Sequence, residues 1–470
     1  MMGAAINVVP FMIHRSVPDI GPYVIPAMLF AALPALLAAF AYASLSSAMP
    51  RAGGSYLYAS RGLHPYLGFV ASFSQWFGLS IVIGVVSYLI VPFIRDVLLV
   101  LEYNQLAATL MLGSVRVPLA LLLLWTFVGV NVLGGRFYER ILIPMMVLMF
   151  TLGGIVVISG LFIDPADFLS AWELENDPVK GINEGKAFSL PVFFSAAAVL
   201  FSSFIGFDSI AQAGSEAKNP TRNLPLAIVL AIGTVGTFYL LFAASMYHMV
   251  PWQLIAAEAQ AHDISAPGLL RYVLPAGLGV AILSGAVIAL INDLPAMLLA
   301  VSRLMFAWAE DGIFPRPVTR THPKYHTPYV ALVASGSMAT IGVLGSHFAG
   351  DFFLGVDIMV TSMMMNFLLI CLSLLAIPYV NPRLARQVTV LRRRKLQVLI
   401  GGTGTLLLIF FLIIHTHKDL TAEVEAWYFR STPVWLMVMS LASIIFFFKL
   451  RQLKNEGTDT NELFTTLPPE

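Results

Sequence analysis

The chain contains eleven separate stretches of apolar residues, each long enough to cross a lipid bilayer as a helix. A spanning helix needs about 20 mostly apolar residues, because the hydrocarbon core is about 30 Å thick. Only 11% of the 470 residues are charged and 58% are hydrophobic, which is far too apolar for a soluble domain. We therefore predict an all-α membrane protein without a separate soluble domain. The predicted spans lie near residues 22–48, 66–94, 117–134, 141–162, 190–212, 225–249, 272–301, 329–346, 354–378, 396–414 and 431–449.

One further apolar stretch precedes these spans and is shorter than they are. It runs from Met1 to Ile13 and ends at His14 and Arg15. At 1.5 Å per residue it covers about 20 Å, which is too short for a complete span. We expect it to be the outer half of a first span that is truncated at its cytoplasmic half. We expect that the true start of the chain lies upstream of Met1, in preference to a transporter whose activity is impaired by an incomplete first helix.

The basic residues indicate the orientation of the spans. If the loop at 50–65 is cytoplasmic, 19 of the 27 Lys and Arg residues fall on the cytoplasmic side, as the positive-inside rule requires. This distribution predicts twelve spans in the cytoplasmic membrane, with both termini cytoplasmic. The polar tail at 450–470 contains Pro-Pro, and we expect it to be disordered. A net charge of +1 argues against a nucleic-acid partner.

Two of the apolar stretches carry a glycine where a spanning helix is expected to continue. They are "MGAAINVVP" (2–10), with Gly3, and "SSFIGFDS" (202–209), with Gly206. A helix unwinds inside a membrane only where protein or a water-filled cavity receives the freed backbone groups. Gly206 alone is explained as well by a close contact between helices. The matching glycine in the first stretch favours two broken helices, which is the best sequence indication of a transporter binding site.

The two interruptions would present opposite ends of helix dipoles to one place. A half-helix that starts near Ile6 directs its N-terminal amides into the break, and such amides bind an anionic group. A half-helix that ends near Phe204 directs its last carbonyl groups into the same space, and these suit an ammonium group. A small molecule that carries both charges is an amino acid.

Four segments of the chain resemble the amino acid–polyamine–organocation permease family. "YASLSSAMPRAGGSYLYASRGLHPYLGF" (42–69) is similar to the family's Pro-Arg-Ala-Gly-Gly-Ser-Tyr signature, and "FIGFDSIAQAGSEAKNPTRNLP" (204–225) to its sixth-helix block. "GAAIN" (3–7) and "SRLMFAWAEDGIFPRPVTRTHPKYHTP" (302–328) resemble two more family motifs. The resemblance implies a leucine-transporter-like fold with two inverted five-helix repeats, helices one and six being broken. These repeats would be residues 1–162 and 190–378, followed by two further spans within 396–449.

The resemblance also implies roles for individual residues. The substrate carboxylate would bind backbone amides around Gly3, Ala4, Ala5 and Ile6. The substrate amino group would bind carbonyl groups near Ser202, Ile205 and Gly206. The family often places a bulky aromatic residue near Ser202, where this chain has a small one. Phe201 or Phe204 would then serve as the gate over the substrate.

Two aspartates lie within the apolar stretches, where ionisable side chains are costly and often functional. Asp208 follows the interruption at Gly206 and could cap the restarting half-helix or take up a proton during transport. Asp293 lies ten residues before Arg303, which places it about 15 Å from the membrane surface. It could be part of a hydrogen-bonded polar pair with Asn292, or it could bind a proton or the substrate's ammonium group.

These features favour a secondary transporter over other classes of membrane protein. The scattered histidines lack metal-ligand spacing, and the sequence contains none of the hydrolase or metalloprotease motifs. We therefore predict no enzyme activity, no cofactor and no metal site. The predicted function is transport of a small or neutral amino acid across the membrane by alternating access. We expect coupling to protons, through Asp208 and Asp293, in preference to coupling to sodium. The alternatives are an amino acid/polyamine exchanger and a non-transporting amino-acid-binding receptor embedded in membrane lipid.

Overall fold

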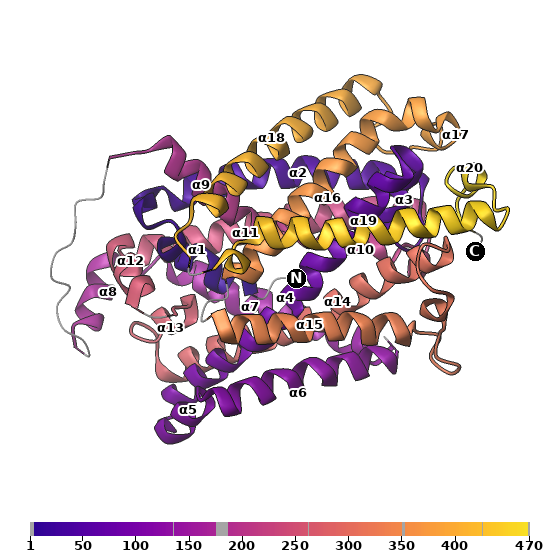
Figure 1. Ribbon diagram of the computed structural model, residues 1–470. Coiled ribbons are helices and arrows are strands. Elements are labelled where there is room, and N and C mark those ends of the chain that lie inside the picture. Colours follow the sequence, from indigo (N-terminus) through magenta and orange to yellow (C-terminus); the bar gives the residue numbers. More distant parts are fainter. Residues whose placement is uncertain are drawn as a thin grey trace.

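The structure is a computed structural model, and its helices form one elongated bundle (Figure 1). It describes residues 4–134, 136–174, 187–261, 263–349, 353–424 and 426–468. Within these ranges the regular elements are helices, and all eleven predicted spans fall on them. Nine of these helices are long and apolar enough to cross a membrane. They are α2 (Val24–Ala48), α4 (Pro65–Val100), α6 (Gly113–Val132), α11 (Pro220–Met249), α14 (Ala276–Glu310), α15 (Tyr329–Ala349), α16 (Phe353–Val380), α18 (Arg394–Thr421) and α19 (Ser431–Asn455).

Three further apolar segments of the bundle are shorter. In α7 (Arg136–Ser159) the apolar segment is Ile143–Ser159. The helix α9 (Leu190–Leu200) continues only as the short 3-10 helix η2 (Phe201–Phe204). The first helix, α1 (Ala4–Ser16), has 13 residues. It packs against α9, η2, α11 and α14, so the first and sixth apolar stretches meet inside the bundle.

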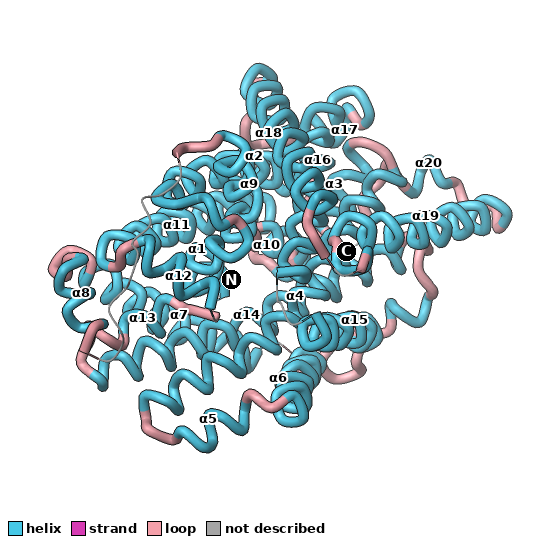
Figure 2. The backbone as a smooth tube through the Cα atoms, turned by 60° about the vertical axis from the view of Figure 1, so that its left-hand side comes forward, coloured by secondary structure: helices cyan, strands magenta, loops and turns pink. Residues whose placement is uncertain are grey.

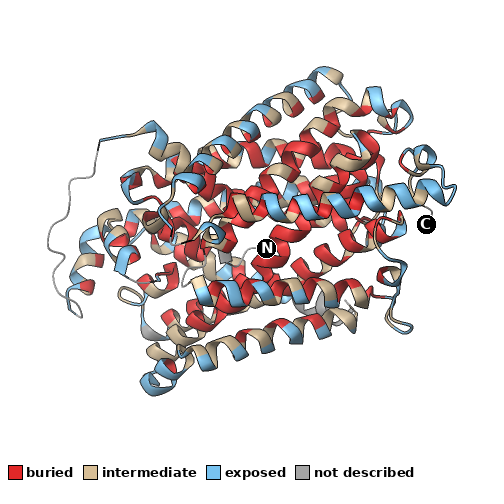
Figure 3. Ribbon diagram, viewed as in Figure 1, coloured by how far each residue is buried: buried red, intermediate tan, exposed pale blue. Residues whose placement is uncertain are grey.

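The helices differ in how much of their surface other helices cover. In the apolar part of α4, 94% of the residues are buried, compared with 17% in α6. A helix that is apolar on all sides belongs inside a protein or against lipid. The helix α4 therefore forms the centre of the bundle, where it packs against α14, α15 and α16, and α6, α18 and α19 form its periphery (Figures 2 and 3).

Short helices cover the two ends of the bundle. One end carries α3 (Gly54–Gly62), α17 (Pro382–Ala385) and α20 (Thr460–Leu463), and we call it the α3 end. The opposite end carries α5 (Asn104–Leu110), α8 (Pro165–Trp172), α12 (Trp252–Ala261) and α13 (Ala266–Leu270) (Figure 1).

The prediction of a disordered tail at 450–470 is wrong for the part of the tail that the structure describes. The helix α19 continues to Asn455, and α20 follows after a short turn. Phe464 is only 5% exposed, and the Asn381 side chain donates a hydrogen bond of 2.9 Å to the Thr465 carbonyl. The tail is ordered because a few apolar side chains within a polar segment pack against the core, among them Leu453, Phe464 and Leu467.

The crossing of α4 and α15 leaves no room for a side chain at two glycines. A Cβ atom at Gly84 would lie 2.0 Å from the Ala339 carbonyl oxygen, and one at Gly342 would lie 2.2 Å from the Ile81 carbonyl oxygen. Small residues let membrane helices approach this closely, and the resulting contact stabilises their association. The contact fixes α15 against the central helix.

We expect Gly342→Ala to lower the free energy of unfolding by about 1–3 kcal/mol, because the added methyl group overpacks this crossing. The measurement is thermal unfolding of the purified protein in detergent. Gly345→Ala is the matched control, since a Cβ atom at that position of the same helix meets nothing within 4 Å. Equal stability of the two variants would contradict the close crossing.

Candidate functional site

The sixth apolar stretch is a broken helix. The α-helix α9 ends at Leu200 and η2 ends at Phe204, after which Ile205 has extended backbone angles (φ −77°, ψ 141°). Gly206 follows with a φ of +134°, which a residue with a side chain rarely adopts. The chain becomes helical again in α10 (Asp208–Gln212). The break therefore lies at Ile205 and Gly206, within the segment that the sequence indicated.

A buried carboxylate holds the backbone at this break. Asp208 is 0% exposed, and its Oδ1 atom accepts a hydrogen bond of 2.9 Å from the Gly206 amide. Its Oδ2 atom accepts a hydrogen bond from the side-chain amide of Gln75 in α4. Asp208 does not cap the restarting half-helix, since α10 has no side-chain hydrogen bond at its N-cap. Its carboxylate instead caps the break itself, at the Gly206 amide.

A network of buried polar side chains extends from Asp208 to α3. The Gln212 side-chain amide donates to the Gln75 side chain at 3.3 Å and to the Ser55 hydroxyl at 2.7 Å. The Ser55 and Tyr42 hydroxyls are 2.7 Å apart, and Asn366 of α16 donates to the Tyr42 hydroxyl at 2.7 Å. The network joins α10, α4, α3, α2 and α16.

Gln212, Tyr42 and Asn366 are not among the site residues predicted from the sequence. The sequence shows each of them only as a polar residue in or beside an apolar stretch. This pattern does not identify the hydrogen-bond partners of their side chains. Many other polar residues of this chain share the pattern and form only local hydrogen bonds, such as that from Ser44 to the Phe40 carbonyl at 2.8 Å. Membership of the network therefore depends on the tertiary structure.

A cavity of about 680 Å³ adjoins the break. This volume is typical of a site for a small molecule. The lining comes from α7, from the η2–α10 segment, from α11 and from α14, and it is mostly apolar. Polar atoms come from few residues, including Ser203, Ser209, Thr234 and Asn292. Gly206 and Phe204 are part of the wall, so the break faces this space.

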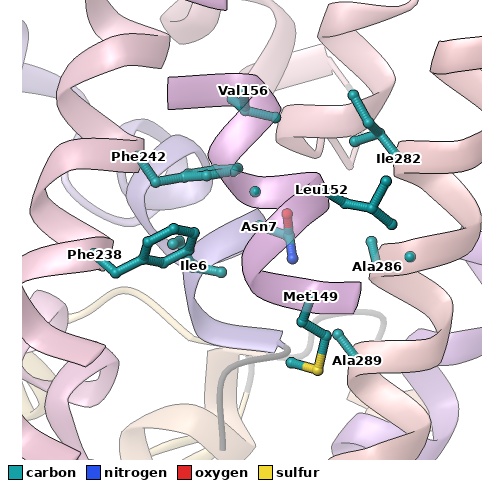
Figure 4. Close-up of a pocket in the computed structure, with 12 residues that line it drawn as sticks. Ile6, Asn7, Met149, Leu152, Val156, Phe238, Phe242, Ile282, Ala286 and Ala289 are labelled. Carbon is teal, nitrogen blue, oxygen red and sulfur yellow. The ribbon is translucent and has the colours of Figure 1, made fainter. Parts of the chain in front are cut away.

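The start of α1 lies beside a second, smaller cavity (Figure 4). Ile6 and Asn7 line it together with Phe238 and Phe242 of α11 and with residues of α7 and α14. The helix begins at Ala4, two residues earlier than the expected start near Ile6. The first four amides of a helix have no partner within it, so the donors that the sequence assigned to a carboxylate belong to the first turn of α1.

The expected start of the half-helix near Ile6 is wrong, because the helix already includes Ala4. Ala4 to Asn7 are α-helical and continuous with the rest of α1, and Gly3 lies outside the described residues. Alanine is the strongest helix former, and the two alanines favour a helical start. Pro10 inside the helix lacks an amide donor, which removes one hydrogen bond to the Ile6 carbonyl without ending the helix.

The two gate candidates point to different surroundings. The Phe201 ring lies 5.8 Å from Phe367 and 6.2 Å from Phe411, centroid to centroid, and it is absent from the cavity wall. Of the two candidates only Phe204 lines the cavity, together with Phe207 and Phe150. Phe201 packs between α16 and α18.

The remaining predicted site residues are buried near the break or on α14. The hydroxyls of Ser202 and Ser203 are buried and make no hydrogen bond with the described residues. The Ser202 carbonyl accepts one bond of 3.3 Å, from the Ile205 amide, which leaves it a second lone pair. Asp293 is 4% exposed and follows Asn292, which lines the larger cavity. Among the described residues, no group of His, Cys, Asp and Glu is arranged to hold a metal ion.

The chain is similar to known proteins over most of its length. A family profile described as "Amino acid permease" matches residues 1–447. The branched-chain amino acid permease BcaP of Bacillus subtilis is 26% identical over 336 residues, which are 69% of this chain and 68% of that protein. The low-affinity putrescine importer PlaP of Escherichia coli is 25% identical over 67% of this chain and 66% of its own length. Human cationic amino acid transporter 4 is 25% identical over 72% of this chain and 51% of its own length.

The capping contact at the break predicts a difference between two substitutions of Asp208. Asp208→Ala leaves the buried Gly206 amide without an acceptor, and we expect it to lower the free energy of unfolding by about 1–3 kcal/mol. Asp208→Asn keeps a side-chain oxygen for this amide and should lower it less. Thermal unfolding in detergent measures both variants, and an alanine variant as stable as the asparagine variant would argue against the cap.

Proposed function

The chain belongs to the amino acid permease family, and we propose that it is a secondary transporter that moves an amino acid or a related amine across the cytoplasmic membrane by alternating access. The observation that carries the proposal is the broken helix at Ile205–Gly206, which forms part of the wall of a cavity large enough for such a molecule. Irregular backbone at membrane depth is tolerated where it lines a cavity, and transporters use it to bind substrate.

Two groups of backbone atoms would hold the charged ends of the substrate. The amides of the first turn of α1, at Ala4, Ala5 and Ile6 together with Gly3, would bind the carboxylate, favoured by the positive end of the helix dipole. The carbonyl groups at Ser202 and Ile205 would bind the amino group. The contact between α1 and η2 supports this arrangement, because it brings the two elements to one place. Phe204 would close over the bound molecule.

The lining of the cavity favours a neutral amino acid with a small or apolar side chain. Most of its wall is apolar, and an apolar wall offers a substrate's charged side chain no compensation for lost water. The second candidate is an amino acid/polyamine exchanger, and the buried carboxylate of Asp293 favours it, since that group could pair with a second ammonium. The named relatives include both a branched-chain amino acid permease and a putrescine importer.

Protons are the proposed coupling ion, and Asp208 and Asp293 are the proposed carriers. Protonation of Asp208 would weaken its hold on the Gly206 amide, because a neutral carboxyl is a weaker acceptor than a carboxylate. The protonation state would then be linked to the conformation of the break. Sodium coupling is the alternative.

The proposed architecture is two inverted five-helix repeats with both termini in the cytoplasm.

Ligand binding tests the substrate class. A neutral amino acid that binds the folded protein should raise its melting temperature by mass action, with about 2.7 kcal/mol of stabilisation at a concentration of 100 times the Kd. The measurement is a thermal-shift screen of the purified protein against amino acids and polyamines at two pH values, with and without sodium. Stabilisation by a polyamine or arginine alone would favour the exchanger, and no stabilisation by any amino acid or amine would contradict the proposed function.

Substitution of both aspartates tests proton coupling. We expect Asp208→Asn with Asp293→Asn to reduce proton-driven uptake into proteoliposomes by about tenfold or more, as expected when essential acid groups are removed. Exchange of substrate for substrate, which needs no net proton movement, should fall much less. Glu173→Gln, at an exposed carboxylate, serves as control. Uptake that is the same in the double variant and the control would remove the aspartates from the coupling mechanism.

A further inference from the structure

A buried ion pair lies at the α3 end of the bundle, outside the proposed substrate site. Arg61 of α3 and Asp311, the residue after α14, are 1% and 3% exposed at their side chains. Two parallel hydrogen bonds of 2.6 and 2.9 Å join the guanidinium to the carboxylate. Burial lowers the pKa of Arg61, but the bonded Asp311 raises it, and the net pKa lies above the ordinary arginine value. A buried pair of opposite charges needs full compensation for the water that it loses.

The C-terminal segment completes this compensation. A guanidinium has five N–H donors, and Arg61 makes five hydrogen bonds. Two go to Asp311 and one of 2.8 Å goes to the Ser60 hydroxyl. The other two, each 3.2 Å, go to the backbone carbonyls of Leu463 and Thr466 in the C-terminal segment. Without this segment, two donors of a buried cation would lack acceptors unless water entered.

The same segment contacts two separate parts of the bundle. Besides Arg61 of α3, it binds the junction of α16 and α17, where Asn381 donates to the Thr465 carbonyl at 2.9 Å. The buried Phe464 ring lies 5.6 Å from the Arg61 guanidinium carbon, a distance at which a cation and an aromatic ring attract each other. A segment that spans several elements restricts their relative movement.

The helix α3 also connects this end to the broken helix. Ser55, near its start, is bound by Gln212 of α10, and the Gly53 amide just before it donates to the Gln212 carbonyl at 3.1 Å. Arg61, near its end, is bound by Asp311 and by the C-terminal segment. One nine-residue helix thus contacts both the element that forms the proposed site and the tail.

We propose that residues 458–468 form a latch that holds the α3 end closed and detaches from Arg61 when that end opens. The latch supplies the last two acceptors of the buried guanidinium, so the closed end is stable without water. When the α3 end opens, α3 separates from Asp311 and water hydrates both charges. The latch bound to Arg61 makes this separation less favourable. The inference rests on the proposed function only for the expectation that the α3 end opens during transport.

Hydrogen–deuterium exchange tests the latch without any substrate. In a chain that ends at Gly457, the amides of α3 should exchange about tenfold or more faster than in the full chain, because the closed state is less favoured. Peptides from α15 should exchange at the same rate in both chains, which shows that the fold is intact. Phe464→Ala, a milder change, should act in the same direction, and Asn461→Ala, at an exposed tail position, should have no effect. Unchanged exchange of α3 in the shortened chain would overturn the proposal.

A crosslink tests whether the latch must detach. The pair Asn381→Cys and Thr465→Cys, made together with Cys371→Ser to remove the one native cysteine, should form a disulfide that holds the tail in place. We expect oxidation to reduce amino acid uptake about tenfold or more and a reductant to restore it, since transport requires each end to open in turn. Each single-cysteine variant should be insensitive to both reagents. Full uptake by the crosslinked protein would overturn the latch. A lack of uptake in the native chain would instead count against the proposed function, and the hydrogen–deuterium exchange experiment would then decide on the latch.

Discussion

One hydrogen bond makes the interrupted helix compatible with a membrane, namely the bond from the Gly206 amide to the Asp208 carboxylate. A backbone group without a partner costs several kcal/mol in an environment that excludes water. The helix that breaks at Ile205 and Gly206 loses its regular backbone partners, and Asp208 replaces one of them from two residues away. The break can then be a permanent feature of the structure, with its backbone oriented toward the larger cavity.

A buried carboxylate itself needs hydrogen-bond donors, and this need accounts for the network around Asp208. Asp208 is satisfied by Gln75, the Gln75 carbonyl by Gln212, and Gln212 also by Ser55 of α3. Each member would be costly to bury alone, and a fully bonded set is both stable and specific in its geometry. The network thereby joins the wall of the proposed substrate site to the cover at the α3 end. The proposed latch acts on that same short helix, through Arg61.

The sequence predicted best those features that depend on neighbours along the chain. The eleven spans were recognisable because each is a local run of apolar residues, and the break at Gly206 because glycine followed by aspartate interrupts one of them. Prediction failed where a partner lies far away in the sequence. The tail looked disordered because it is polar and ends near Pro-Pro, but Phe464 and the carbonyls beside it find Arg61, about 400 residues earlier. Phe201 and Phe204 were equivalent in the sequence, and only the packing of Phe201 against Phe367 separates them.

The sequence by itself determined that this protein is a helical membrane protein with a broken sixth stretch, and it carried the motifs of the permease family. These properties follow from composition, from the length of apolar runs and from short motifs, all of which are readable along the chain. The tertiary structure alone decided which polar groups pair in the interior and where the C-terminal segment packs. The physical reason is that a buried donor or charge is stable only with partners at hydrogen-bonding distance, and helices far apart in the sequence supply those partners.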